Sequence, residues 1–193
     1  MKTPDQMNEY LIPLKSLQKL LEHFNNQGVF IGGIASSLLG IPRYTADIDA
    51  MILLSLDKIP DLLKVAETFD IVPRMESIID FARQHRVLLL RHRESGVNID
   101  INLGMLPFEI EIVKRSQLKT IGELQIRLPS VEDLIIMKAV ANRMKDKIDI
   151  QNMVQVNPNL DQKRIKKWVT QFATVLEQPE LWTDLERILK NKV

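Results

Sequence analysis

Two aspartates lie one residue apart in an apolar stretch of the sequence, TADIDAMILL, which covers residues 45–54. In a β-strand, alternate side chains point to the same face, so the carboxylates of Asp47 and Asp49 would lie together and Ile48 would face the other way. Two such acids in apolar surroundings are costly unless a cation lies between them. Because Mg²⁺ prefers carboxylate oxygens and substrate phosphates as ligands, the pair predicts a magnesium site.

A third acid lies in a later stretch of alternating polar and apolar residues, VNIDINL, at 97–103. Here Asn98, Asp100 and Asn102 share one face of a predicted strand. If this strand lies beside the first, Asp100 adds a third carboxylate, and three carboxylates can hold two metal ions about 3.5–4 Å apart. One ion would act on a leaving phosphate and the other on an attacking hydroxyl, which is the chemistry of phosphoryl or nucleotidyl transfer.

A pair of glycines, Gly32 and Gly33, lies between an apolar run that predicts a strand at 29–31 and a short predicted helix at 34–39. Exposed amides at the start of a helix, together with the positive end of its dipole, bind anions such as phosphate. Glycines let that backbone approach the anion closely. Lys138, on a later predicted helix, would either reach a triphosphate as a point charge or be an ordinary exposed lysine.

Helices and strands alternate along most of the chain, and helices alone follow. We expect helices at 13–26, 34–39, 60–69, 74–84, from 130 to beyond 143, at 161–177 and at 179–190. We expect strands at 29–31, 46–54, 87–92 and 97–103, and a hairpin formed by 117–121 and 124–128. The segment 107–114 is compatible with a helical turn or a strand. This order predicts an α/β (α+β) fold with a helical C-terminal part.

The overall composition is that of an ordinary globular protein of 193 residues. Lys and Arg number 26 against 25 Asp and Glu, so no global charge favours nucleic acid, and any polyanion site has to be local. The absence of cysteine excludes disulfides, thiolate metal sites and a cysteine nucleophile. The sequence has no signal-peptide core and no apolar run of about 18 residues, so we expect a cytoplasmic protein that does not enter a membrane.

The motifs resemble those of a known enzyme superfamily. Gly32-Gly33, a spacer and the RYTADID stretch at 43–49 look like the signature of the nucleotidyltransferases of DNA polymerase beta type, whose metal site is completed by a later strand acid, here Asp100. The LPSVEDL stretch at 128–134, with Lys138 after it, is similar to AbiEii-type toxins and related uncharacterised nucleotidyltransferases. Within the superfamily, the likeness of residues 128–134 and Lys138 points to an AbiEii-like subtype.

The resemblance implies a mixed sheet flanked by helices, with a nucleotidyltransferase-like domain over residues 1–156 and C-terminal helices over 157–193 packed on it. It also implies Mg²⁺ in a two-metal site and a nucleoside triphosphate as donor. Asp47, Asp49 and Asp100 would be the catalytic, metal-binding residues, and Asp100 would also activate the acceptor hydroxyl. The nucleotide would be bound by Gly32, Gly33, Ser36, Ser37, Arg43 and Lys138.

We therefore expect a Mg²⁺-dependent nucleotidyltransferase that moves a nucleoside monophosphate from the triphosphate to a hydroxyl of RNA, protein or a small molecule. The alternative is a non-catalytic module of the same fold that binds a nucleotide or a partner protein. By family analogy, the chain would also suit the toxin-like half of a toxin–antitoxin pair, with an antitoxin as its partner.

Two further groups of charged residues allow a structural interpretation beside a functional one. The basic stretch consists of Arg83, His85, Arg86, Arg91 and Arg93. It is either a solvated strand edge or a contact for an anionic acceptor such as tRNA. Asp146 would match a later acid of the toxin family, or else Asp146 and Asp149 would pair with Lys145 or face solvent.

Overall fold

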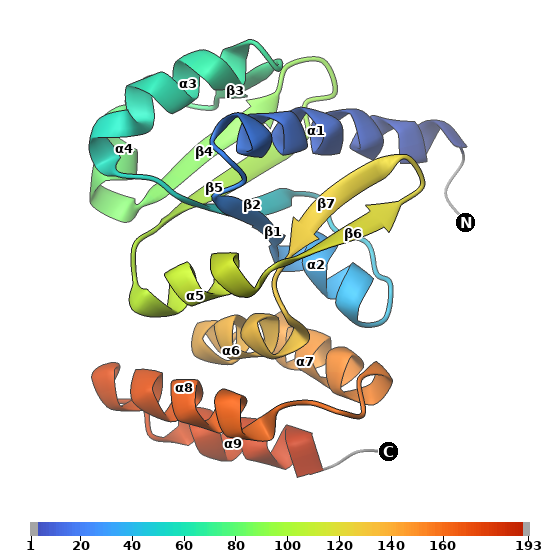
Figure 1. Cartoon of the computed structure of the whole chain (residues 1–193), viewed down its shortest axis with the longest axis vertical. Coiled ribbons are helices and arrows are strands. Elements are labelled where there is room, and N and C mark those ends of the chain that lie inside the picture. Colours follow the sequence, from blue (N-terminus) through green and yellow to red (C-terminus); the bar gives the residue numbers. More distant parts are fainter. Residues whose placement is uncertain (1–3, 191–193) are drawn as a thin grey trace. The chain divides into compact units, whose positions relative to one another are not determined.

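The computed structural model describes residues 4–190 (Figure 1). Contacts group the described residues into two compact units. Unit 1 runs to Ile34 and resumes at Thr45–Leu128, and unit 2 consists of Ala35–Tyr44 and the chain from Pro129 onward. The predicted division into a nucleotidyltransferase-like domain up to residue 156 and C-terminal helices packed on it stays a prediction. Residues 1–3 and 191–193 of its two ranges lie outside the described chain.

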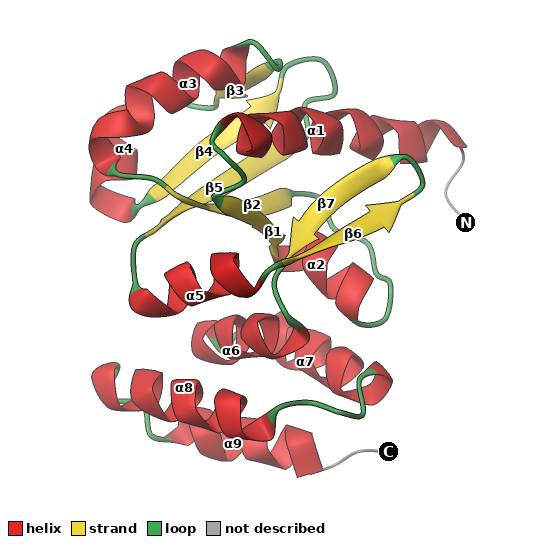
Figure 2. Ribbon diagram, viewed as in Figure 1, coloured by secondary structure: helices red, strands yellow, loops and turns green. Residues whose placement is uncertain are grey.

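Within the described residues, unit 1 contains a five-stranded mixed sheet (Figure 2). Its strands are β1 (Gly28–Ile31), β2 (Ile48–Leu53), β3 (Ile71–Pro73), β4 (Val87–His92) and β5 (Asn98–Gly104). Their spatial order is β1-β2-β5-β4-β3, with β2 and β5 parallel and the other neighbours antiparallel. A separate ladder joins β6 (Gln117–Ile121) to β7 (Leu124–Leu128), which confirms the predicted hairpin.

The two parallel strands in the middle of this sheet differ in polarity. β2 has the sequence IDAMIL, in which Asp49 is the one polar residue, and its apolar residues Ile48 and Met51 are completely buried. In β5, buried Ile99 and Ile101 alternate with more polar positions, as the period of two predicts. The fold therefore brings an almost entirely apolar strand, which carries one carboxylate, against a strand with one polar face.

The helices of unit 1 surround its strands. They are α1 (Pro4–His23), α3 (Ile59–Glu67), α4 (Ile78–His85) and α5 (Pro107–Arg115), with the 3₁₀ helix η1 (Leu56–Lys58) before α3. α5 occupies the segment that the sequence left open. Pro107 lies in its first turn, and the Glu109 carboxylate accepts hydrogen bonds from the backbone N–H groups of Met105 and Leu106 at 2.7 and 2.8 Å. The mixed sheet flanked by helices is thus confirmed.

Some predicted boundaries in unit 1 are wrong. α1 begins at Pro4 and contains Pro13, which the sequence placed at the helix start. The short strand β3 was not predicted, because three residues are too few to show an alternating pattern. α4 begins at Ile78, since the residues that follow β3 form a turn instead of the predicted first helical turn.

Unit 2 consists mainly of helices that pack on one another (Figure 1). They are α6 (Val131–Ala141), α7 (Met144–Val156), α8 (Gln162–Val175) and α9 (Glu180–Lys190), and α2 (Gly32–Leu39) begins in unit 1 and ends in unit 2. The Ser130 hydroxyl accepts a hydrogen bond from the Asp133 N–H at 3.2 Å, which confirms the predicted cap. Across the described chain, we find no helix with the length and apolar character needed to cross a membrane.

The predicted helix from 130 to beyond 143 is wrong in its length. α6 ends at Ala141, and Asn142 has the left-handed φ of 50° that commonly closes a helix. Arg143 then has an extended backbone and precedes the first turn of α7. The segment is therefore a pair of helices with a sharp break between them.

Candidate active site

Two carboxylates meet on the parallel strands of unit 1. Asp49 of β2 and Asp100 of β5 are partners in the register of this pair. Asp47 immediately precedes β2, instead of lying inside it as predicted. The two acid-bearing strands lie side by side, which is the condition for Asp100 to add a third carboxylate, and this comes from the pairing of segments about fifty residues apart.

Hydrogen bonds fix the conformation around Asp47. The Asn98 side chain donates from Nδ2 to Asp47 Oδ1 at 3.2 Å. The Thr45 hydroxyl donates to the backbone carbonyl of Asp47 at 3.3 Å. Asn98 belongs to the polar face of β5 that the sequence identified, so that face positions Asp47 as well as supplying Asp100.

The Asp100 carboxylate accepts a hydrogen bond and forms an ion pair with the Arg74 guanidinium. Burial raises the pKa of Asp100, the charge of Arg74 lowers it, and the charges of Asp49 and Asp47 raise it again, so the net shift is upward. The three acids therefore act on one another electrostatically. Sequence reasoning missed Arg74, because its contact with Asp100 depends on a strand order that no local pattern reveals.

Gly32 lies directly against the Asp49 carboxylate. A Cβ at Gly32 would be 1.9 Å from Asp49 Oδ2, and the residue has a left-handed φ of +62°. A Cβ at Gly33 would be 2.3 Å from the Thr45 hydroxyl oxygen. Any larger residue at either position would displace a side chain of the acidic site. The glycine pair is thus required by close approach, and its predicted contact with phosphate stays a prediction.

The three acids fit a divalent cation by their chemistry. Carboxylate oxygens are the preferred ligands of Mg²⁺, and Asp47, Asp49 and Asp100 are brought together by adjacent strands with Gly32 leaving room beside Asp49. Among the side chains that the structure describes, however, no three acidic or histidine groups are already arranged as the ligands of a metal ion. Asp47 faces Asn98 and Asp100 faces Arg74, so these carboxylates would exchange partners to hold an ion.

A second charged cluster lies in unit 2, where Lys138 is held by two buried acids. The Lys138 ammonium donates to Asp149 Oδ2 at 2.6 Å and to Asp146 Oδ1 at 3.1 Å. Arg43 donates to both oxygens of Asp149, at 2.5 and 2.8 Å, and Arg143 donates from Nε to Asp146 at 2.6 Å. The side chain of Lys138 is 7% exposed, and those of Asp146 and Asp149 are 0% and 2% exposed.

This geometry excludes two of the structural alternatives. Lys138 is not an exposed helix lysine, and Asp146 and Asp149 do not face solvent. Burial by itself raises the pKa of each acid, but the hydrogen bonds and charges of Lys138 and of the arginines outweigh it, so the pKa of both lies below its usual value. The predicted nucleotide-binding residues Arg43 and Lys138 therefore share the carboxylate of Asp149.

The serines after the glycine pair are engaged within the fold. Ser36 is buried. The Ser37 hydroxyl donates to the carbonyl of Arg43 at 2.9 Å and accepts from the Arg43 N–H at 3.3 Å, so it orders the loop that carries Arg43. The predicted contacts of both serines with a triphosphate stay predictions.

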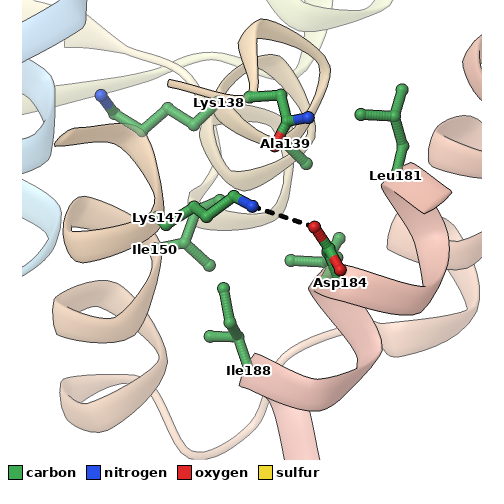
Figure 3. A pocket seen from close by; sticks show the side chains of 9 residues that line it. Lys138, Ala139, Lys147, Ile150, Leu181, Asp184 and Ile188 are labelled. Atoms are coloured by element: carbon green, nitrogen blue, oxygen red, sulfur yellow. Dashed lines mark hydrogen bonds and ion pairs between the residues drawn. The ribbon is translucent and has the colours of Figure 1, made fainter. Parts of the chain in front are cut away.

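A small crevice lies among α6, α7 and α9 of unit 2 (Figure 3). Its cavity volume is about 10 Å³, enough for about one water molecule and far too small for a nucleotide. The Lys147 ammonium reaches the Asp184 carboxylate at 2.9 Å across it. In the same view the Lys138 side chain leads away from Asp184. Its ammonium donates instead to Asp146 and Asp149.

Three arginines of the predicted basic stretch have partners within unit 1. Arg93 pairs with Glu67 at 3.0 Å, and Arg86 donates twice to the backbone carbonyl of Leu103, at 2.9 and 2.7 Å. Arg83 lies 3.7 Å from Asp80 on the same helix. These contacts favour the structural interpretation over a contact surface for an anionic acceptor.

The chain matches the model of a known protein family. Residues 10–186 match the model of a family described as a nucleotidyltransferase of unknown function, DUF6036. The chain belongs to this family. Membership confirms the resemblance to the nucleotidyltransferase superfamily, whereas the AbiEii-like subtype stays a hypothesis. A search of curated proteins gave no significant match.

Solved structures share the fold of this DUF6036 family member at low sequence identity. The crystal structure of an antigenic nucleotidyltransferase-like protein from Paracoccidioides brasiliensis matches with a TM-score of 0.54 and 18% identity, over 96% of this chain and 93% of that one. The solution structure of the antibiotic-resistance factor ANT(2'')-Ia matches with a TM-score of 0.50 and 15% identity, over 94% and 90% of the two chains. At such identities the likeness establishes the fold alone.

Proposed function

We propose that this protein is a Mg²⁺-dependent nucleotidyltransferase that moves a nucleoside monophosphate from a nucleoside triphosphate to a hydroxyl acceptor. One observation carries the proposal: Asp49 and Asp100 are paired in register on parallel strands, with Asp47 directly before the first of these strands and the Gly32 backbone against Asp49. Membership of a nucleotidyltransferase family supports nucleotidyl transfer in general.

The acids have distinct roles in this proposal. Bound Mg²⁺ would supply charge neutralisation on the triphosphate and acidify the attacking hydroxyl. Asp47 and Asp49 would hold the metal, and Asp100 would be a ligand or accept the proton of the hydroxyl. The hydroxyl oxygen forms a bond to the α-phosphorus while the bond from that phosphorus to the bridging oxygen breaks, and pyrophosphate leaves.

The triphosphate would be bound by the nucleotide-binding residues that the sequence identified. The backbone N–H groups at Gly32 and Gly33 lie at the positive end of the α2 dipole. Arg43 and Lys138 are the cations proposed for the phosphates. Lys138 would share its ammonium between phosphate and the buried Asp146 and Asp149, whose hydrogen bonds orient it.

Label transfer tests the proposal directly. The purified chain is incubated with Mg²⁺ and each of four α-³²P-labelled nucleoside triphosphates, against total RNA including tRNA, protein and small alcohols. We expect the wild type to label one acceptor class and Asp49→Asn to lose at least about a hundredfold in rate, since a metal ligand is removed. Asp80→Asn, a change of an exposed acid on α4, is the matched control. Unchanged transfer by Asp49→Asn would overturn the proposal.

A non-catalytic binding module is the second candidate, and the ion pair between Arg74 and Asp100 favours it, because it occupies a proposed metal ligand. Thermal unfolding with each triphosphate, with and without Mg²⁺, separates the two. Stabilisation that requires both triphosphate and metal supports the enzyme, and no response to any triphosphate supports the module. The antitoxin partner and the cytoplasmic location stay predictions, and co-purification with a protein encoded next to this chain would test the former.

A further inference from the structure

Arg74 is fixed on the sheet at a position from which it reaches the acidic site. It directly follows edge strand β3, and its backbone N–H donates to the carbonyl of Leu89 in β4 at 3.0 Å. Leu89 is in turn the register partner of Asp100 in β5. Two strand spacings of about 4.8 Å each therefore separate the Arg74 backbone from that of Asp100. The arginine side chain spans this distance across β4 to its ion pair.

Charge makes this contact different from an ordinary surface ion pair. The side chains of Arg74 and Asp100 are 26% and 31% exposed, so both are partly removed from water. Asp47 and Asp49 add their negative charges to the surroundings of Asp100, and the positive charge of Arg74 acts on Asp100 in the opposite direction. A guanidinium stays protonated at any physiological pH, so its positive charge beside the acids is permanent.

We propose that Arg74 is a positioning residue that holds Asp100 in the metal-free protein and sets the affinity of the acidic site for divalent cations. This inference rests on the proposed function, because the proposed function assigns the metal to Asp47, Asp49 and Asp100. The guanidinium stabilises the three acids while no ion is bound. When an ion binds, Arg74 has to give up or share Asp100, and its charge repels the ion. Metal binding therefore includes a change of partner at Asp100.

Metal titration of the full chain tests this inference without any assay of activity. Free Mn²⁺ is followed by electron paramagnetic resonance, and Mg²⁺ binding by calorimetry, at low ionic strength. We expect Arg74→Gln to bind Mn²⁺ about tenfold more tightly than the wild type, the effect of removing one unit charge near a divalent ion. Arg74→Lys keeps the charge and should return the affinity to near the wild-type value. The gain should shrink as salt is added, because screening weakens the repulsion.

Arg93→Gln is the control, since Arg93 directly follows β4 and pairs with Glu67 and Asp70, neither of which belongs to the proposed metal site. It should leave the Mn²⁺ affinity unchanged. Equal or weaker Mn²⁺ binding by folded Arg74→Gln, with the wild type binding normally, overturns the inference alone. If neither the wild type nor any Arg74 variant binds Mn²⁺ or Mg²⁺, the inference and the metal dependence of the proposed function are both overturned. Binding by Arg74→Gln but not by the wild type supports the inference.

Discussion

Gly32 is constrained both by its left-handed backbone conformation and by its close approach to the acidic site. The methyl group of an alanine at this position would collide with the Asp49 carboxylate. The alanine would also have to adopt a left-handed φ. Gly96 offers a natural comparison, because its φ is +68° and a Cβ there would meet nothing within 4 Å. The two positions share the conformational demand and differ in the contact with Asp49.

We therefore predict that Gly32→Ala lowers the free energy of unfolding by about 1–3 kcal/mol more than Gly96→Ala does. The common part of the cost is the left-handed backbone, about 1–2 kcal/mol for a residue other than glycine. Urea unfolding of both variants measures the difference. Adding Asp49→Ala to Gly32→Ala should remove most of the excess, because it removes the colliding group. Equal costs at the two glycines would contradict this account.

At the scale of elements, the break between α6 and α7 creates the cluster around Lys138. In one continuous helix, Lys138 and Asp146 would be about 12 Å apart along the axis, at 1.5 Å per residue. In the structure the Lys138 ammonium is 3.1 Å from Asp146, because the left-handed Asn142 ends α6 and changes the direction of the chain before α7. The turn thus makes possible a contact that a longer helix would prevent.

This turn leads to a prediction about position 142. Asn142→Gly should leave the free energy of unfolding within a few tenths of a kcal/mol of the wild type, since glycine accepts a positive φ without strain. Asn142→Ala should lower it by about 1 kcal/mol, because alanine favours a continuous helix. Thermal and urea unfolding of both variants provide the measurement. A more stable alanine variant would show that the break is not a requirement of the fold.

Sequence patterns predicted the elements whose period is visible within one segment. The alternation of β5 and the cap at Ser130 are examples. The spacing of Lys138, Asn142 and Asp146 at intervals of four imitates a helical stripe, and it misled the prediction, because a single asparagine changes direction without breaking the spacing. The contact of Arg74 with Asp100 could not be predicted, because it depends on β3 and β5 both lying beside β4.

At the scale of the whole molecule, the buried acids Asp146 and Asp149 of unit 2 make the free energy of unfolding depend on pH. The pKa of Asp149 and the pKa of Asp146 are both lowered in the folded chain, in spite of burial, by their cationic partners. A group with a lowered folded pKa stabilises the fold above its unfolded pKa, near 4 for aspartate, and this contribution is lost as pH falls through the folded value. The contribution is therefore complete at neutral pH and disappears below about pH 4.

Asp149→Asn should accordingly flatten the dependence of unfolding free energy on pH. One proton fewer is taken up on acid unfolding, so the slope below about pH 4 should fall by up to about 1.4 kcal/mol per pH unit. Urea unfolding between pH 2.5 and 6 measures the slope, with the exposed Asp80→Asn as control. A slope that is the same in Asp149→Asn and the wild type would exclude a linked role for this carboxylate.

The segment Ala35–Tyr44 has a consequence for how the gene can be divided. Its contacts belong to unit 2, yet it interrupts the sequence of unit 1, so the chain passes from one unit to the other after residues 34, 44 and 128. No single cut in the coding sequence separates the two units. A fragment that began at Pro129 would lack Arg43 and would leave the buried Asp149 without one of its cations. The units are consequently inherited together, and recombination at any one point cannot exchange unit 2 for another.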